Sequence, residues 1–135
     1  MHQAEITYKN STTKVYFERH VSFLQKLVTT QQCVIITDEN IIKQYAQEFS
    51  FTKKIIIPSG EQSKNFQTVD YVVQSLVAMQ FDRHATIIAI GGGVVLDIVG
   101  FVAGIYKRGI RVVYVPTSLL AMVDAAIGGK NGVDI

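Results

Sequence analysis

The sequence predicts an α/β protein with a Rossmann-like parallel sheet and helices on both of its faces. Short, continuous apolar runs, typical of strands that are buried on both faces, alternate with segments whose apolar residues recur at helical spacing. A run of three glycines joins one of these strands to the helix that follows it. At 135 residues the chain fits a single domain with a real hydrophobic core.

The first half of the chain predicts a hairpin, two helices and one buried strand. Strand-like stretches at 4–8 and 12–17 flank the turn-forming residues Lys9, Asn10 and Ser11, which indicates an N-terminal hairpin. Apolar residues then recur at near-helical spacing. The predicted elements are a helix over 21–28, a strand over 33–37 and a helix over 41–49.

The second half predicts three more strands, each followed by a helix. Pro58 and Pro116 end two of the strands, because proline has no N–H to donate to a neighbouring strand. The predicted strands are 55–57, 86–90 and 112–115, and the predicted helices are 66–79, 94–106 and 119–127.

The stretch Ala-Ile-Gly-Gly-Gly-Val-Val-Leu-Asp at 89–97 predicts an anion-binding turn. Glycines let the backbone approach a ligand closely, and a helix that begins there points free N–H groups and its positive dipole end into the turn. Asp97 lies one turn into the helix, where it can accept hydrogen bonds from hydroxyls or order the loop. The stretch matches neither the Rossmann nor the Walker glycine pattern, and a tight turn without a ligand is the alternative interpretation.

Polar residues and glycines follow the predicted strands at the point where each strand ends. In parallel sheets ligands bind beyond the carboxyl ends of the strands, so a single shared site is expected there. Helix capping is the simpler explanation for several of these residues taken singly. The residues are Asp38, Asn40, Gly60, Glu61, Lys64, the glycine run with Asp97, Thr117 and Ser118.

Composition argues against several other classes of protein. The net charge is +2 with scattered basic residues, which gives no electrostatic footprint for nucleic acid. The single cysteine, Cys33, is interpreted as a buried structural thiol. The N-terminus lacks an apolar signal region and no segment is apolar enough to span a bilayer, so we expect a soluble, cytoplasmic protein. The chain stops just after a glycine-rich segment, and we expect it to be part of a longer sequence.

Five motifs in order resemble those of the 3-dehydroquinate synthase family of sugar-phosphate cyclases, an enzyme family of the shikimate pathway. The resemblance extends from about residue 34 to the end of the chain. The motifs are Pro-Ser-Gly-Glu-Gln-Ser-Lys at 58–64, Gly-Gly-Gly-Val-Val-Leu-Asp at 91–97, Tyr-Lys-Arg-Gly at 106–109, Val-Pro-Thr-Ser-Leu-Leu at 115–120 and Val-Asp-Ala-Ala-Ile-Gly-Gly-Lys at 123–130.

The resemblance implies a two-domain enzyme of which residues 1–135 are the N-terminal NAD-binding domain. A C-terminal helical domain would bind zinc or cobalt through one glutamate and two histidines beyond this chain, and His2, His20 and His84 match none of these ligands. The implied reaction converts 3-deoxy-D-arabino-heptulosonate 7-phosphate to 3-dehydroquinate and phosphate with catalytic NAD. We expect the 135-residue chain alone to be inactive.

The resemblance also implies roles for individual residues. Asp124 and Lys130 would contact the substrate as catalytic residues. Arg108 would reach the substrate phosphate of a neighbouring subunit, which implies a homodimer. The implied NAD contacts are Asp38, Asn40, Glu61, Lys64, Gly92, Gly93, Val94, Asp97, Thr117 and Ser118.

The sequence departs from the family pattern at four positions. Leu96 stands where glycine is common, and Ser118 replaces a threonine but keeps the hydroxyl. Asn131 and Asp134 stand where threonine and asparagine are common.

Two other functions stay open at this point. One is a different sugar-phosphate cyclase or a metal-dependent polyol dehydrogenase with the same glycine-rich loop. The other is a nucleotide-binding module without catalysis. The coding sequence downstream of residue 135 would distinguish them.

Overall fold

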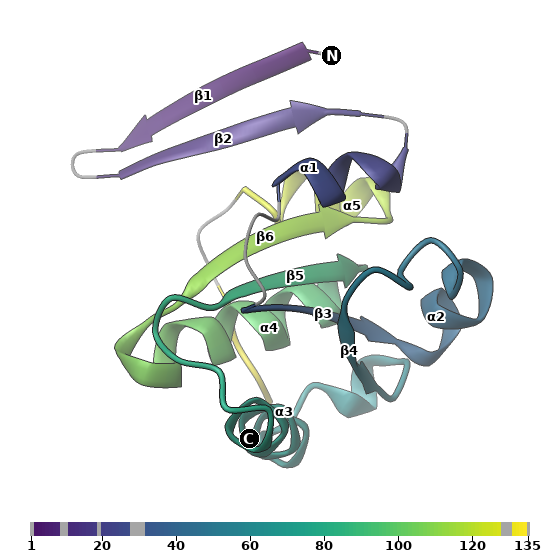
Figure 1. Cartoon of the computed structure of the whole chain (residues 1–135), viewed down its shortest axis with the longest axis vertical. Helices are drawn as coiled ribbons and strands as arrows, with labels where there is room; N and C mark the ends of the chain where they lie inside the picture. Colours follow the sequence, from purple (N-terminus) through teal and green to yellow (C-terminus); the bar gives the residue numbers. More distant parts are fainter. Residues whose placement is uncertain (1, 9–10, 19, 28–31, 128–130, 135) are drawn as a thin grey trace.

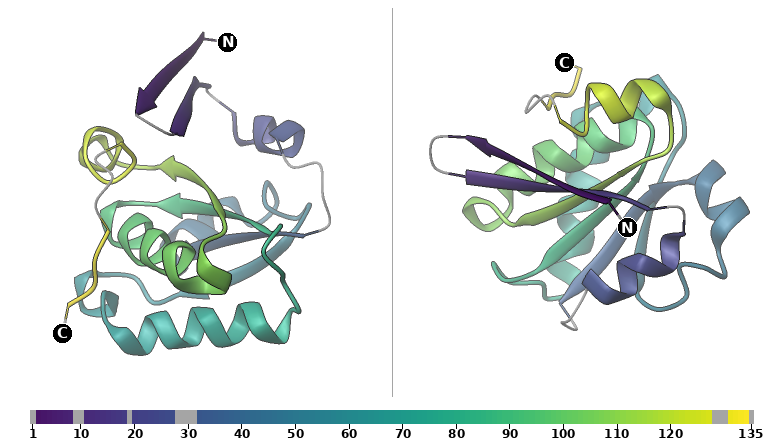
Figure 2. Two further views of the ribbon diagram at one scale, coloured as in Figure 1. Left: turned by 90° about the vertical axis from the view of Figure 1, so that its left-hand side faces the viewer. Right: turned by 90° about the horizontal axis from the view of Figure 1, so that it is seen from above.

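The N-terminal hairpin predicted from the sequence is present in the structure, a computed structural model that describes residues 2–8, 11–18, 20–27, 32–127 and 131–134. Strands β1 (His2–Tyr8) and β2 (Ser11–Phe17) pair antiparallel. The hairpin projects from the α/β body on the side of the last sheet strand (Figures 1 and 2). The predicted turn residues Lys9 and Asn10 lie outside the described residues.

A four-stranded parallel sheet forms the centre of the body, which confirms the predicted fold class. Its strand order is β4 (Lys53–Ile57), β3 (Cys33–Asp38), β5 (Thr86–Gly91) and β6 (Arg111–Pro116). The chain runs outward from β3 to β4, then crosses back to β5 and continues to β6. The direction in which successive strands are added therefore reverses between β3 and β5. In sheets of this type a crevice for ligands lies at that point.

Helices cover both faces of the sheet (Figure 1). Val34 and Ile36 of β3 belong to a core cluster with α3 (Phe66–Ala78) and α4 (Gly93–Ile105). Ile35, between them, points to the opposite face and clusters with Leu24 of α1 (Leu24–Leu27) and with residues of α2 (Glu39–Tyr45). Because both faces are covered, β3 is buried from Cys33 through Thr37, as its unbroken apolar sequence predicts.

Three predicted helices differ from the observed ones by more than one residue in their bounds, while the two long ones, α3 and α4, agree to within one residue. The predicted helix over 41–49 begins two residues earlier, at Glu39, because the Asp38 carboxylate caps it, and it ends at Tyr45. The predicted helix over 119–127 is the shorter α5 (Leu119–Val123), capped by Ser118. The segment 21–27 is divided into a 3-10 turn, η1 (Val21–Phe23), and α1. Two further 3-10 turns, η2 (Glu61–Ser63) and η3 (Tyr106–Arg108), were not predicted.

A buried side-chain hydrogen bond joins the two central strands beside the crevice. The Thr37 hydroxyl donates to the carbonyl oxygen of Ile90 at 2.7 Å, and the Thr37 side chain is fully buried. This contact fixes the carboxyl end of β3 against that of β5.

We predict that Thr37→Val lowers the free energy of unfolding by about 1–3 kcal/mol, because it removes a buried donor from the Ile90 carbonyl. Urea unfolding followed by circular dichroism measures the change. Thr7→Val, on the exposed hairpin, is the control and should change stability by less than about 0.5 kcal/mol. Equal stability of the two variants would contradict the role given to the Thr37 hydroxyl.

Candidate functional site

The turn between β5 and α4 leaves open space over its backbone. A Cβ on Gly92 would meet only the Ser118 hydroxyl oxygen, at 3.9 Å, and a Cβ on Gly93 would meet nothing within 4 Å. A Cβ on Gly91, in contrast, would lie 2.6 Å from a methyl group of Val95. The packing of this chain therefore requires glycine at 91 but gives no reason for glycine at 92 and 93.

The first turn of α4 is also free of a side-chain cap. Gly92 is the N-cap residue and has no side chain to accept from the helix N–H groups. The amides at a helix start need acceptors, and an anion that rests on the open backbone would supply them. The geometry thus suits a phosphate-bearing ligand.

The end of β6 lies against this glycine turn. The Thr117 N–H donates to the carbonyl oxygen of Gly91 at 2.9 Å, which ties the loop after β6 to the end of β5. The Ser118 hydroxyl accepts from the N–H of Ala121 at 3.2 Å and so caps α5. Two residues that the sequence predicts as cofactor contacts are thereby placed beside the predicted anion cradle.

An ion pair joins two further predicted cofactor residues. Lys64 Nζ lies 2.8 Å from a carboxylate oxygen of Asp97, so the loop after η2 is attached to the second turn of α4. Each side chain keeps about a fifth of its surface exposed, at 20% and 22%. The hydrogen bond to Asp97 raises the pKa of Lys64 above its ordinary value.

Asp38 and Asn40 form a third group at the same edge of the sheet. The Asp38 carboxylate accepts from the N–H groups of Asn40 and Ile41, both at 2.9 Å, and the Asn40 N–H also approaches the Ser59 hydroxyl at 3.3 Å. The helix-capping role considered for Asp38 is therefore present in the structure. The Ser59 contact, which the sequence did not predict, connects this group to the loop that carries Glu61.

Leu96, where the family commonly has glycine, does not fill the open space at the turn. Its side chain is fully buried in the molecule.

Arg108 does not lie with these residues. It follows the far end of α4, a helix of 13 residues and thus about 20 Å long. Lys107 and Arg108 both have left-handed backbone conformations, with φ of 50° and 67°, and Gly109 follows with φ of 107°. Such strain in non-glycine residues is unusual and concentrates at functional positions.

The two predicted substrate contacts near the end of the chain are placed differently. Asp124 is exposed and ends α5. Lys130 lies outside the described residues.

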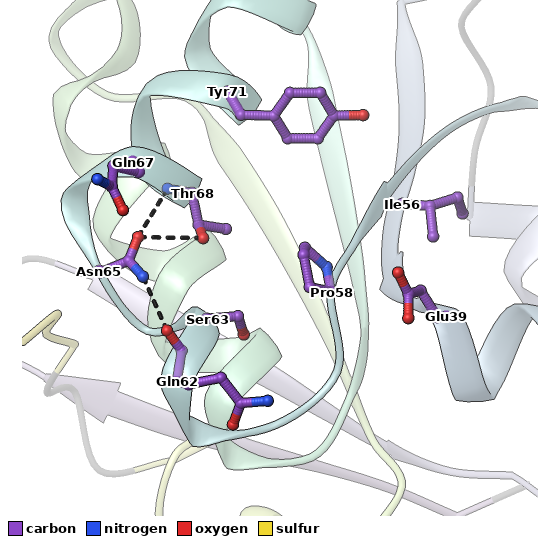
Figure 3. Close-up of a pocket in the computed structure, with 9 residues that line it drawn as sticks. All are labelled: Glu39, Ile56, Pro58, Gln62, Ser63, Asn65, Gln67, Thr68 and Tyr71. Atoms are coloured by element: carbon purple, nitrogen blue, oxygen red, sulfur yellow. Dashed lines mark hydrogen bonds between the residues drawn. The ribbon is translucent and has the colours of Figure 1, made fainter.

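The structure also contains an open hollow of about 510 Å³ beside β4 (Figure 3). Figure 3 shows Tyr71 of α3 on one side of it and Glu39 of α2 on the other. None of the predicted cofactor residues lines this hollow. The lining residues are Glu39, Ile56, Pro58, Gln62, Ser63, Asn65, Gln67, Thr68 and Tyr71.

Metal ligands do not gather in the part of the chain that the structure describes. Within it, no group of three or more histidine, cysteine, aspartate or glutamate side chains could hold an ion. Cys33 is buried, as predicted, and burial raises the pKa of its thiol. His84 is exposed on the loop before β5. No helix among the described residues is long and apolar enough to cross a membrane.

Comparison with known protein families identifies the family to which this chain belongs. The family profile described as 3-dehydroquinate synthase N-terminal matches residues 54–135. The chain belongs to the 3-dehydroquinate synthase family. The match includes the glycine turn, Asp97, Lys64 and the loop after β6, so the resemblance inferred from the motifs is confirmed.

Curated relatives of this family are similar along most of the chain. A 3-dehydroquinate synthase of Clostridium kluyveri is 43% identical over 148 aligned residues, which cover 100% of this chain and 41% of that protein. A 3-dehydroquinate synthase of Campylobacter concisus is 37% identical, and the aligned region covers 93% of this chain and 37% of that protein. The chain thus spans about two fifths of the length of these relatives.

Solved structures of other sugar-phosphate cyclases have the same fold. A 2-deoxy-scyllo-inosose synthase, complexed with carbaglucose-6-phosphate, NAD+ and Co2+, matches with a TM-score of 0.82 and 25% identity, over 99% of this chain and 40% of that one. A 2-epi-5-epi-valiolone synthase from Streptomyces hygroscopicus subsp. jinggangensis, with NAD+ and Zn2+ bound, matches with a TM-score of 0.82 and 28% identity, over 96% of this chain and 39% of that one.

We predict that Asp97→Asn lowers the pKa of Lys64 toward its ordinary value of 10.5, because the carboxylate that stabilises the ammonium is lost. An NMR titration of labelled lysine side chains measures this shift. Asp70→Asn, at an exposed position on α3, is the control and should leave Lys64 unchanged.

The sign of the pH dependence follows from the raised pKa. From neutral pH up to about pH 10.5 the ion pair contributes its full stabilisation to the native state, and this contribution is lost as the pH rises through the higher folded-state pKa of Lys64. A Lys64 titration that Asp97→Asn does not alter would show that the pair is not formed in solution.

Proposed function

We propose that the full-length protein encoded by this gene is a 3-dehydroquinate synthase and that this chain is its NAD-binding domain. The reaction would convert 3-deoxy-D-arabino-heptulosonate 7-phosphate to 3-dehydroquinate and phosphate. The observation that carries the proposal is the open, uncapped backbone at Gly92 and Gly93, in a chain that belongs to this family. It lies at the carboxyl edge of the parallel sheet, where nucleotide cofactors bind.

The chain's own residues would bind and orient the cofactor. The N–H groups at 92–94 would donate to the NAD pyrophosphate, and the positive end of the α4 dipole would favour its charge. Asp97 would accept from a ribose hydroxyl, while its ion pair with Lys64 holds the carboxylate in place. Thr117 and Ser118 would offer hydroxyls on the opposite side of the turn.

The remaining predicted contacts support the same proposal. Asp38 ends β3, Asn40 lies in the first turn of α2 and Glu61 begins η2 after β4, and these residues would face the adenosine end of a dinucleotide placed on the turn. NAD, when bound, supplies a reversible hydride acceptor, and the protein's task is to orient it. The divalent metal, zinc or cobalt, would be held by residues beyond 135 and would polarise the substrate oxygens.

The position of Arg108 supports a homodimer. Because Arg108 lies at the other end of α4 from Gly92, it would serve the substrate phosphate of a second subunit rather than its own. Its guanidinium can bind phosphate oxygens through two parallel hydrogen bonds. Asp124 and Lys130 would contact the substrate, and the 135-residue chain alone would not turn over substrate.

A second candidate is another sugar-phosphate cyclase activity. The observation in its favour is the likeness to the inosose and valiolone synthases, each with a TM-score of 0.82. The sequence relatives named 3-dehydroquinate synthase, with identities of 43% and 37%, favour the first candidate.

Phosphate release by the purified full-length protein tests the proposal. The protein is supplied with NAD, zinc and the heptulosonate phosphate, and in parallel with glucose 6-phosphate, whose carba-analogue is bound in the inosose synthase structure. Release from the heptulosonate phosphate alone supports 3-dehydroquinate synthase. Turnover of another sugar phosphate would favour the second candidate, and no turnover of any would favour a non-catalytic nucleotide-binding module.

We predict that Gly92→Val weakens NAD binding by at least about tenfold, because its side chain fills the space over the backbone. Stability should fall by less than about 1 kcal/mol, since no atom of the chain occupies that space. Gly91→Val is the contrasting variant and should mainly lower stability, because its Cβ overlaps Val95. Calorimetry on the full-length protein measures both, and unchanged NAD affinity in Gly92→Val would place the pyrophosphate elsewhere.

We predict that Arg108→Gly separates function from stability. Loss of a charge-assisted hydrogen bond to phosphate should lower kcat/KM for the phosphorylated substrate by about tenfold to a hundredfold. The free energy of unfolding should stay the same or rise by up to about 1 kcal/mol, because glycine relieves the left-handed strain at φ of 67°.

Lys107→Gly is the matched control for this experiment. It relieves similar strain, at φ of 50°, one residue away, and should leave kcat/KM unchanged. If both variants lower kcat/KM equally, the effect comes from the loop conformation and not from the Arg108 guanidinium.

A further inference from the structure

Gly100 is a buried glycine in the interior of α4. Glycine at such a position costs about 0.5–1 kcal/mol relative to alanine, so its presence calls for a packing reason. A Cβ on Gly100 would overlap the side-chain oxygen of Asn131 and crowd the hydroxyl of Tyr114. Gly104, four residues later on the same side of the helix, has nothing within 4 Å of its Cβ position.

Gly100 makes room for a contact between the end of the chain and the sheet. The Tyr114 hydroxyl of β6 donates to Asn131 Oδ1 at 3.5 Å, a long hydrogen bond, directly over Gly100. The contact joins residues that are 17 positions apart in the sequence. Residues 131–134, which we call the strap, thus begin on the surface of α4.

The other end of the strap is attached to the loop that carries Lys64. The N–H of Asp134 donates to the carbonyl oxygen of Lys64 at 2.8 Å, and Asp134 pairs with Asn65 in a parallel bridge. Val133, between the two ends, packs against the core cluster of α3 and α4. The strap therefore runs from β6 across α4 to the loop before α3.

The contacts of the strap form a closed circuit that includes two of the predicted cofactor residues, Lys64 and Asp97. The strap holds the backbone of Lys64, the Lys64 side chain binds Asp97, and Asp97 lies one turn before Gly100 on α4. We propose that the strap positions the Lys64–Asp97 pair for NAD, with Gly100, Tyr114 and Asn131 as positioning residues that act through Lys64. The proposal rests on the proposed NAD site and deepens it.

The test compares Gly100→Ala with Gly104→Ala in the full-length protein. In Gly100→Ala the new methyl displaces Asn131, so NAD affinity should fall by about threefold to thirtyfold. Hydrogen exchange of the Asp134 amide, followed by mass spectrometry, should become faster. Gly104→Ala should change neither, because its methyl meets open space. Should Gly100→Ala fail to fold, Asn131→Ala removes the same contact without adding atoms and should have the same effects.

A double-mutant cycle with Lys64→Ala shows whether the strap acts through Lys64. If it does, Asn131→Ala weakens NAD binding in the unaltered protein but adds no further loss in the Lys64→Ala background. Additive losses in the double variant would overturn the proposal. So would single variants that lower Tm or speed up Asp134 exchange but leave NAD affinity unchanged, because the strap would then act only on stability. If the unaltered protein bound no NAD, the proposed function itself would fail, and with it the role of the strap.

Discussion

The parallel direction of all four sheet strands is the constraint on which the rest of this structure depends. Parallel neighbours cannot be joined by a tight turn, so each connection carries a helix across a face of the sheet. Those helices bury both faces of the sheet, and the carboxyl ends of its four parallel strands all lie at the same edge. Residues far apart in the sequence, such as Asp38, Gly92 and Thr117, are thereby gathered without any local signal that relates them.

The strands and long helices could be predicted because burial requires apolar residues in a characteristic pattern along the sequence. β3 is apolar from Cys33 to Ile36 because both of its faces are covered, and α3 repeats its apolar residues at helical intervals. Shorter elements depend on single contacts. The start of α2 depends on the Asp38 cap, and α5 ends at Val123 although the apolar residues continue to Ile127. Periodicity does not encode such contacts.

The residues proposed for the site can be picked out one by one from the sequence, but the contacts between them cannot. Gly92 and Asp97 are recognisable in the glycine turn, and Lys64 is recognisable from the motif resemblance. The ion pair between Lys64 and Asp97 joins two loops, so only the fold reveals it. The left-handed conformation of Arg108 is equally hidden, because arginine has no preference for positive φ and only Gly109 signals it.

The glycines of this chain divide by what a side chain would meet at each of them. At Gly91 and Gly100 it would overlap the chain's own atoms, so these glycines serve internal packing. At Gly92 and Gly93 it would meet almost nothing, although neither has a positive φ that would require glycine. Space that the protein itself does not use is what a ligand needs. The glycines at the two places on α4 therefore serve opposite purposes: those at its start leave the backbone open, as the proposed NAD site requires, and Gly100 in its interior makes room for the strap.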